Sequence, residues 1–290
     1  MTLFDGKPDM SERVVLSASR MTDMPKYYPK EIIEEVNKRL AKNIKIHTLV
    51  LWTKHPRSLL AQPLRIFLTS LKTLEIQLYI QLTISGMGKI VAGKKAESRP
   101  FIPEPNAPRA EDSLKALTEI IDLVEKPERI RLRIDPIVRL KDFEGKTFSN
   151  LKFFQGIVEF SAKLGVKHFT FSLLQTGIHR KVDMRFKKIG CQIVPPDNNE
   201  RYNTAIWLTG LEEKYKIKIS ACSVKGFPES KCIDGELLQQ LHDKKYPVSR
   251  KQPRKRALCG CTSSIDIGGW PPKKCFTGCD YCYGNSKYSI

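Results

Sequence analysis

Strand signals alternate with helix signals along most of this chain, and this alternation restricts the fold more than any other feature. Apolar or β-branched runs with the length of buried parallel strands occur at 14–17, 47–52, 78–85, 130–134, 168–173 and 216–221. Segments with helical spacing of apolar residues lie between them, at 31–40, 59–71, 114–124, 151–164 and 204–214. Strands and helices repeated in this order require right-handed parallel crossovers, so we predict an α/β fold.

Six strand–helix units are too few for a closed eight-stranded barrel but suit a partial one. We therefore predict two domains. The first is a TIM-like partial (β/α)6 barrel over residues 1–225, and the second is a basic, cysteine-rich, cluster-binding tail over residues 226–290 that packs on the barrel mouth. The Pro-, Gly- and Lys-rich segment 89–108 is expected to be an insertion after the third strand, and long insertions at this place often act as lids.

The chain has no run of about 18 apolar residues, so a membrane span is not expected. Its first residues lack the basic and apolar segments of a secretory signal, which predicts a cytoplasmic protein. Seven of the eight cysteines follow residue 220. Clustered cysteines in a large chain of a reducing compartment indicate metal ligation rather than disulfides.

The final cysteines, Cys275, Cys279 and Cys282, have C-x3-C-x2-C spacing, with a tyrosine on each side of Cys282. Three thiolates on one loop can hold three corners of a [4Fe-4S] cluster and leave the fourth iron open for a substrate or cofactor. Two other interpretations remain. Structural zinc also uses Cys-x2-Cys spacings, with Cys259 or Cys261 as the fourth ligand, and a cluster with a purely redox role is the third interpretation.

Four further cysteines form a second candidate set. They are Cys222, Cys232, Cys259 and Cys261. Four thiolates satisfy either a second iron–sulfur cluster or a zinc ion, and Gly260 would allow the tight turn that a C-x-C pair needs. Cys222 is alternatively an ordinary buried thiol at a strand end.

Polar residues follow the predicted strands, where the chemistry of parallel β/α folds collects. Our candidates for catalytic or substrate contacts are Arg133, Asp135, Arg20 and Lys54, and our candidates for cofactor contacts are Ser17, Ser19, Thr83, Ser172 and Tyr281. Arg133 and Asp135 share a face by period-two alternation, so a structural ion pair at the rim is the alternative for them. Arg20 and Asp23 could likewise pair or cap a helix.

The formal net charge of +19 favours a polyanionic partner such as DNA or RNA, although a Lys-rich solvated surface would give the same charge. Seven positive charges and one tyrosine gather in the run 244–256, directly before Cys259. We expect this run either to guide a phosphate backbone to the cluster or to be a solvated loop.

Several motifs together resemble the family known as domain of unknown function 1848. They include the segment from Leu16 to Pro25, Trp52-Thr53-Lys54-x-Pro56, Arg133-x-Asp135-Pro136-Ile137 and the cysteine-rich tail from Cys259 to Tyr283. The resemblance covers nearly the whole chain, and it implies no assigned reaction.

The triplet is also similar to that of radical S-adenosylmethionine (SAM) enzymes, and with its two tyrosines it resembles spore photoproduct lyase, a DNA-repair enzyme. This likeness implies reductive cleavage of SAM and an electron donor such as ferredoxin or flavodoxin. Those enzymes carry the triplet after the first strand and a Gly-Gly-Glu-like stretch after the second. Here the triplet ends the chain and Trp52-Thr53-Lys54 follows the second strand, so a permuted delivery of the cluster is implied.

Two functional hypotheses follow. The first is an iron–sulfur radical SAM-like enzyme that acts on an anionic substrate, such as nucleic acid, in repair or modification. The second is a non-catalytic nucleic-acid-binding protein in which the cysteines hold structural zinc or a redox cluster.

Overall fold

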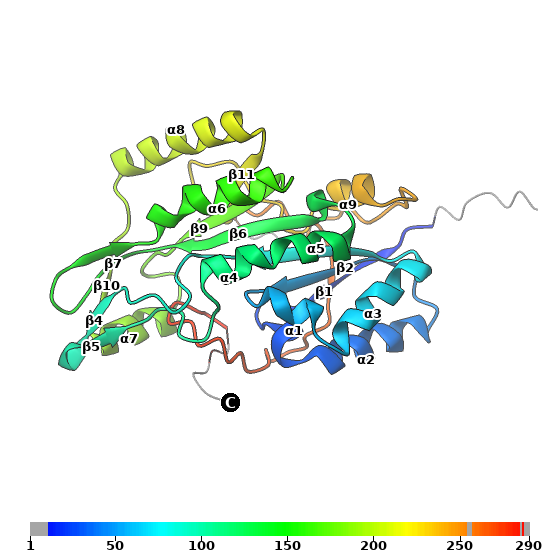
Figure 1. The fold of residues 1–290 in the computed structure, drawn as a ribbon, viewed down its shortest axis with the longest axis horizontal. Coiled ribbons are helices and arrows are strands. Elements are labelled where there is room, and N and C mark those ends of the chain that lie inside the picture. Colours follow the sequence, from blue (N-terminus) through cyan, green and yellow to red (C-terminus); the bar gives the residue numbers. More distant parts are fainter. Residues whose placement is uncertain (1–10, 254–256, 285, 287–290) are drawn as a thin grey trace, which may run out of the picture.

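A parallel seven-stranded sheet forms the centre of the molecule (Figure 1). The computed structural model describes residues 11–253, 257–284 and 286. The strand order is β11-β9-β6-β3-β2-β1-β12, and every neighbouring pair is parallel. The strands are β1 (Val14–Ala18), β2 (Ile46–Thr53), β3 (Gln77–Thr83), β6 (Ile130–Ile137), β9 (His168–Leu173), β11 (Lys218–Ala221) and β12 (Ile265–Asp266).

The predicted strands are all present, and they lie side by side in the order in which they occur along the chain. The mixed α/β class and the parallel sheet are therefore confirmed. A TIM barrel is not confirmed, because the sheet is not closed. The outer edge of β1 pairs with β12, where Leu16 is opposite Ile265, and β11 remains at the other end of the strand order.

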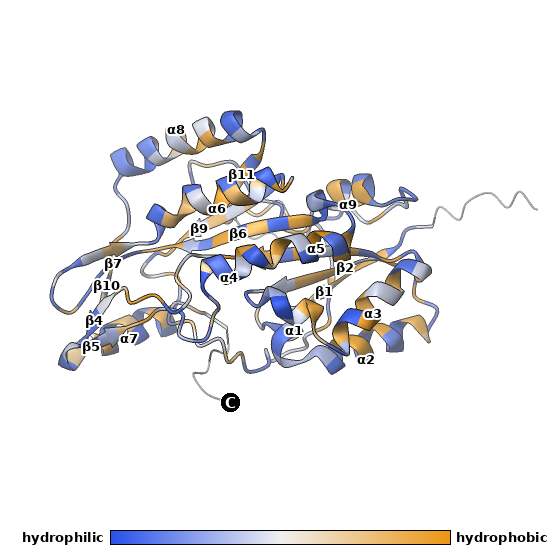
Figure 2. Ribbon diagram, in the orientation of Figure 1, coloured by the Kyte–Doolittle hydropathy of each residue, from blue (hydrophilic) through white to orange (hydrophobic). Residues whose placement is uncertain are grey.

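The crossover helices share one hydrophobic core with one face of the sheet. Apolar side chains of α2, α3, α5, α6 and α8 pack in this core with alternate residues of the strands, such as Leu51 and Leu82. Figure 2 shows both hydrophobic and hydrophilic colour on α5 and α6, as expected for helices with one buried side. The α-helices are α1 (Met24–Tyr27), α2 (Pro29–Leu40), α3 (Leu64–Ser70), α4 (Ala110–Lys115), α5 (Leu117–Val124), α6 (Leu151–Lys163), α7 (Arg180–Ile189), α8 (Asn198–Tyr215) and α9 (Gly235–Leu241), with short 3-10 helices at Pro56–Leu60, Leu71–Leu74, Ala96–Ser98 and Pro127–Arg129.

The other face of the sheet is covered by the chain that follows β11. Val15, Val50 and Tyr79 of the sheet pack there against Ile233 and Leu238, the latter from α9. Hydrogen bonds repeat along this contact: the Gln81 side chain donates to the Cys232 carbonyl, and the Gln77 side chain donates to the Leu238 carbonyl over 3.2 Å. The crossover helices thus cover one face of the sheet, and the chain after β11 covers the other face.

The insertion after β3 forms part of a separate small subdomain. It holds a hairpin of β4 (Gly93–Lys95) and β5 (Arg99–Phe101), which lies near α7 and a three-stranded sheet of β10 (Gln192–Ile193), β7 (Arg139–Lys141) and β8 (Thr147–Ser149) (Figure 1). Phe101 and Phe186 pack edge to face in its core, with ring centroids 6.0 Å apart. The red C-terminal segment runs beside α7 in Figure 1.

Candidate functional site

The cysteine loop, residues 275–283, lies at the carboxyl ends of β2 and β3 and is held by the insertion and by α7. The backbone of Asp280 donates to the Pro103 carbonyl over 3.0 Å, and the Asn106 side chain donates to the Phe276 carbonyl over 2.8 Å. Arg185 of α7 donates to the carbonyls of Cys279, Asp280 and Cys282. These contacts hold the backbone of the loop in place.

Behind this loop, the buried carboxylate of Glu104 collects three side-chain donors. It accepts hydrogen bonds from Lys54 Nζ at 2.9 Å, from Ser85 Oγ at 2.7 Å and from the Tyr281 hydroxyl. The exposed fraction of the Glu104 side chain is 3% and that of Lys54 is 17%, so this ion pair is largely screened from water. Glu104 thus connects the ends of β2 and β3 to the residue before the third cysteine.

The thiols of this loop interact with one another and with Lys54. Burial raises the pKa of Cys279 well above its ordinary value, the Lys54 ammonium opposes this, and the charges of Cys282 and Cys275 add to it. Burial also lowers the pKa of Lys54, but Glu104 and Cys279 outweigh it, so that the pKa of Lys54 is raised. Lys54 is therefore a buried cation that favours a thiolate at Cys279.

The end of β1 is tied to the same place. Asp23 caps α1 by accepting from the Lys26 backbone, which confirms the expected cap, and it also accepts from Thr53 Oγ1 at 2.8 Å and from the Lys54 backbone at 2.7 Å. His55 Nε2 lies 3.1 Å from Thr277 Oγ1 of the cysteine loop. The ends of β1 and β2 and the cysteine loop are thus connected by hydrogen bonds.

The second cysteine set lies further along the same edge of the sheet. Cys222 directly follows β11, and Cys222, Cys232, Cys259 and Cys261 all belong to one apolar cluster. Hydrogen bonds from Cys222 and Cys261 hold the pKa of Cys232 well below its ordinary value, with the Arg133 guanidinium as a further cause, and the pKa values of Cys222 and Cys261 are raised by the same hydrogen bonds. Arg133 Nη1 lies 2.8 Å from the Cys232 sulfur. Three members of the predicted set, Cys222, Cys232 and Cys261, therefore interact with one another beside Arg133.

Gly260 separates the C-x-C pair, and it is required by close approach rather than by its φ angle. A Cβ atom at this position would lie 2.8 Å from Glu229 Oε1 and 2.8 Å from Lys231 Cγ. The tight turn expected at Gly260 is not what the glycine provides here, since it is not among the glycines with positive φ.

The predicted rim residues connect the two cysteine sets. Arg133 forms an ion pair with Asp135, as the structural alternative stated, and Asp135 also accepts from Ser172 Oγ. The Arg133 guanidinium lies 5.2 Å from the centre of the Trp52 ring, and the indole NH of Trp52 donates to Ser17 Oγ over 2.9 Å. Four of our candidates, Ser17, Arg133, Asp135 and Ser172, are therefore linked through direct contacts and through Trp52.

The remaining candidates lie around this group. The exposed Arg20 places its guanidinium 5.6 Å from the Trp52 ring centre. Ser19, with a φ of 53°, accepts from the Met21 backbone over 3.3 Å. Thr83 borders a small cavity together with Lys54 and Glu104. Tyr281 contacts Glu104 and lies under Lys54, whose nitrogen is 5.6 Å from the ring centre.

Among the described residues, no group of three or more His, Cys, Asp or Glu side chains converges as a site for a single metal ion. Zinc requires its donors around one point, whereas each thiolate of an iron–sulfur cube binds a different iron. The loop thiols are free, and the Gly284 backbone donates to the Cys282 sulfur over 3.3 Å. Three free thiols on one loop are compatible with a cluster in which each thiolate would bind its own iron.

The basic run does not lie beside the cysteine loop where the structure describes it. The Tyr246 carbonyl contacts His47 at the start of β2, over 3.0 Å, and the Pro247 carbonyl accepts from Arg13 before β1. These are the amino ends of the strands, so the expected position beside the triplet is wrong for this part of the run. Arg254, Lys255 and Arg256 lie outside the described residues.

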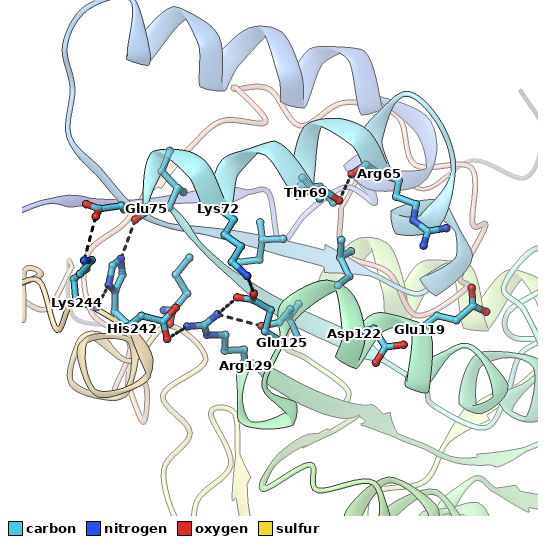
Figure 3. A pocket seen from close by; sticks show the side chains of 17 residues that line it. Arg65, Thr69, Lys72, Glu75, Glu119, Asp122, Glu125, Arg129, His242 and Lys244 are labelled. Carbon is cyan, nitrogen blue, oxygen red and sulfur yellow. Dashed lines mark hydrogen bonds and ion pairs between the residues drawn. The ribbon is translucent and has the colours of Figure 1, made fainter.

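A cavity of about 520 Å³ also lies at the amino ends of the strands, between α3 and α5 (Figure 3). Three of its cations already have acidic partners. Lys72 pairs with Glu125, Arg129 with Glu125 and Asp243, and Lys244 with Glu75. The cavity therefore lies at the opposite ends of the strands from the cysteine loop, and its paired charges give it no role in the candidate site.

Sequence analysis missed two residues of the site. Glu104 lies in a Pro-rich insertion with no local pattern that indicates burial. Arg185 lies on α7, a helix that was not predicted, because only Val182 and Phe186 of this mostly charged segment are buried.

The family model described as "Domain of unknown function (DUF1848)" matches residues 15–284 of the chain. The chain belongs to this family. DUF1848 membership confirms the resemblance seen in the sequence, and it covers both cysteine sets and all the rim residues. Curated proteins include no detectable relative. No helix in the described parts of this DUF1848 protein has the length and apolar character that a bilayer span needs.

Proposed function

We propose that this chain is an iron–sulfur enzyme of the radical SAM type, in which Cys275, Cys279 and Cys282 hold a [4Fe-4S] cluster. One observation carries the proposal: the three free thiols share a loop that is fixed through its backbone at the carboxyl ends of β2 and β3. Such a cluster keeps one iron open for SAM and supplies the electron that cleaves SAM to methionine and a 5′-deoxyadenosyl radical. Consecutive parallel strands with their helices on one face support a partial, open barrel as the scaffold.

The rim residues of this chain would bind and orient the polar groups of SAM and of an anionic substrate. Arg20 offers an exposed guanidinium, and the Arg133–Asp135–Ser172 group offers both charges in a fixed arrangement. Buried Lys54 counteracts part of the rise in the pKa of Cys279 that burial causes. Glu104 holds Lys54 and Tyr281 in position and thereby excludes water from behind the cluster loop.

The proposal extends to the second cysteine set, which would hold another iron–sulfur cluster, because its thiols do not converge on one point as a zinc ion requires. The specific observation is that Cys232 interacts with both Cys222 and Cys261, next to Arg133. A chain with structural zinc here and no cluster at the triplet would be the non-catalytic alternative, with nucleic acid as its partner.

Anaerobic purification with iron and sulfide analysis tests the proposal, followed by incubation with dithionite and SAM. We expect a brown protein that releases 5′-deoxyadenosine, with reduced ferredoxin or flavodoxin as the biological electron donor. Replacing Cys275, Cys279 and Cys282 together with Ala should abolish the release of 5′-deoxyadenosine and should lower the iron and sulfide content by one cluster. Cys191→Ala is the matched control, because Cys191 is buried in the same subdomain core but belongs to neither cysteine set, and its thiol lies 3.7 Å from the Lys94 carbonyl. A colourless zinc protein, or a cluster that never cleaves SAM, would contradict the proposal.

A further inference from the structure

Helix α7 presents a basic face to solvent beside the cysteine loop. Its ten residues include five basic side chains and one acidic side chain, that of Asp183. With about 3.6 residues per turn, Val182 and Phe186 lie on one side of the helix, and both are buried in the core of the small subdomain. Four exposed side chains lie on the opposite side: Arg180, Met184, Lys187 and Lys188. The outer face of α7 therefore carries three cations around one apolar side chain.

Acidic side chains do not neutralise this face. None of its three cations forms an ion pair with another of the described residues. The carboxylate of Asp183 is engaged at the amino end of the helix, where it accepts a hydrogen bond from the Gly177 backbone over 3.1 Å. In the turn beside the other end of the helix, Glu144 pairs with Lys94 over 2.7 Å. The cations of the outer face are therefore available to an acidic partner.

Apolar side chains accompany these cations. Met184 is 59% exposed in the middle of the basic face. Phe143 is 54% exposed and lies against the end of the helix, because a Cβ atom at Gly190 would be 2.8 Å from its ring. Protein interfaces combine an apolar centre, enriched in Met and aromatic side chains, with a polar rim. A membrane anchor needs a broad apolar helix face, and α7 uses its apolar face inside the subdomain. The outer face of α7 therefore fits an acidic protein better than a bilayer.

The same helix holds the cysteine loop. Arg185 donates to the carbonyls of Cys279 and Cys282, and Lys181 Nζ donates to the Gly284 carbonyl over 2.7 Å. Figure 1 shows the C-terminal segment running beside α7. An α-helix with its side chains is about 10–12 Å wide. A protein bound to the outer face of α7 would therefore lie about one helix width from the loop.

We infer that the outer face of α7 is the docking site of a small acidic electron-carrier protein. The inference rests on the proposed function, because it names the surface at which the electron for SAM cleavage would arrive. The reduced carrier would lose one electron, and the proposed cluster at the triplet would gain it. Redox partners form small, transient interfaces, and opposite charges increase the rate at which such partners meet.

Release of 5′-deoxyadenosine driven by a reduced, acidic flavodoxin tests this inference, with dithionite-driven release measured in parallel. Lys187→Glu/Lys188→Glu should raise the KM for flavodoxin about tenfold, whereas dithionite-driven release should not change, because a small reductant needs no docking surface. Met184→Ala should raise the same KM about fivefold. The matched control, Lys42→Glu/Arg65→Glu, changes the net charge equally at two exposed cations near the amino ends of the strands, and its KM should stay within about twofold of the wild type.

Direct binding separates docking from cluster chemistry. Calorimetric titration of each full-length protein with oxidised flavodoxin should give the same order of affinities, and the affinity of the wild type should fall with added salt more steeply than that of Lys187→Glu/Lys188→Glu. Lys187→Gln/Lys188→Gln repeats the test with a milder change at the end of the helix. Equal flavodoxin binding by the wild type and both double variants would overturn the inference, as would a loss of affinity for oligonucleotides or anionic vesicles but not for flavodoxin. Wild-type protein that binds flavodoxin but releases no 5′-deoxyadenosine with dithionite would instead contradict the proposed function.

Discussion

Replacing Glu104 tests whether the cysteine loop depends on the buried carboxylate behind it. Glu104→Ala leaves the Lys54 ammonium without its counter-ion and removes the acceptor of the Ser85 and Tyr281 hydroxyls. Breaking a buried ion pair from one side costs about 3–5 kcal/mol, and each lost hydrogen bond costs about 1 kcal/mol. Because these terms overlap, we expect the free energy of unfolding to fall by about 4 kcal/mol.

Urea unfolding followed by circular dichroism, with reductant and chelator present, measures this loss in the metal-free chain. Glu97→Ala is the control: Glu97 belongs to the same insertion, but its side chain is 74% exposed and pairs with Arg99 at the surface. Its change should stay below about 0.5 kcal/mol. The double variant Lys54→Met/Glu104→Leu should recover most of the stability, because an apolar pair leaves no buried charge. Equal losses for Glu104→Ala and Glu97→Ala would refute the reasoning.

Three more predictions concern the fold and the rim. Asn150→Ala should cost about 3 kcal/mol in urea unfolding, since this buried side chain donates to the Ser85 and Pro136 carbonyls and accepts from Val138; a loss below about 1 kcal/mol would contradict its role. Burial lowers the pKa of His47 from 6.5 to about 3, so its stabilising effect is complete above pH 6.5 and is lost as the pH falls; by pH 5 it should have lost about 2 kcal/mol. His47→Gln should lack this loss when the free energy of unfolding is measured in urea at several pH values. Identical pH profiles of the two proteins would show that His47 does not cause the loss. Arg133→Met should decrease metal content at the second cysteine set while the triplet keeps its iron, and unchanged total metal would show that the guanidinium does not support that set.

Strands β2 and β3 were predictable from the sequence because they are buried on both faces along nearly their whole length and are therefore rich in apolar residues. The open state of the sheet was not predictable. The outer edge of β1 pairs with β12, and this strand of two residues, Ile265 and Asp266, is too short to give a sequence pattern. The helix expected at 59–71 is divided into a 3-10 turn and α3, with Pro63 directly before α3.

The candidate site was predictable in part. Arg133, Asp135 and Ser172 could be placed at one edge because residues at the ends of parallel strands meet there. Which charges meet across loops depends on tertiary packing, and for this reason the carboxylate of Glu104 was missed. The charge run 244–256 indicated a polyanion contact, but charge alone does not tell which end of the strands a segment will cover.

The two faces of the sheet are covered by different parts of the sequence. The six long strands are complete at Ala221, and every cysteine except Cys191 comes later in the chain. The sheet face that carries Arg131 and Arg133 is therefore covered by residues that follow the strands in the sequence. The segment that finally covers this face also supplies the thiols of the second set. Metal bound at the proposed second set would therefore lie beneath this cover, between the sheet and the chain that follows β11.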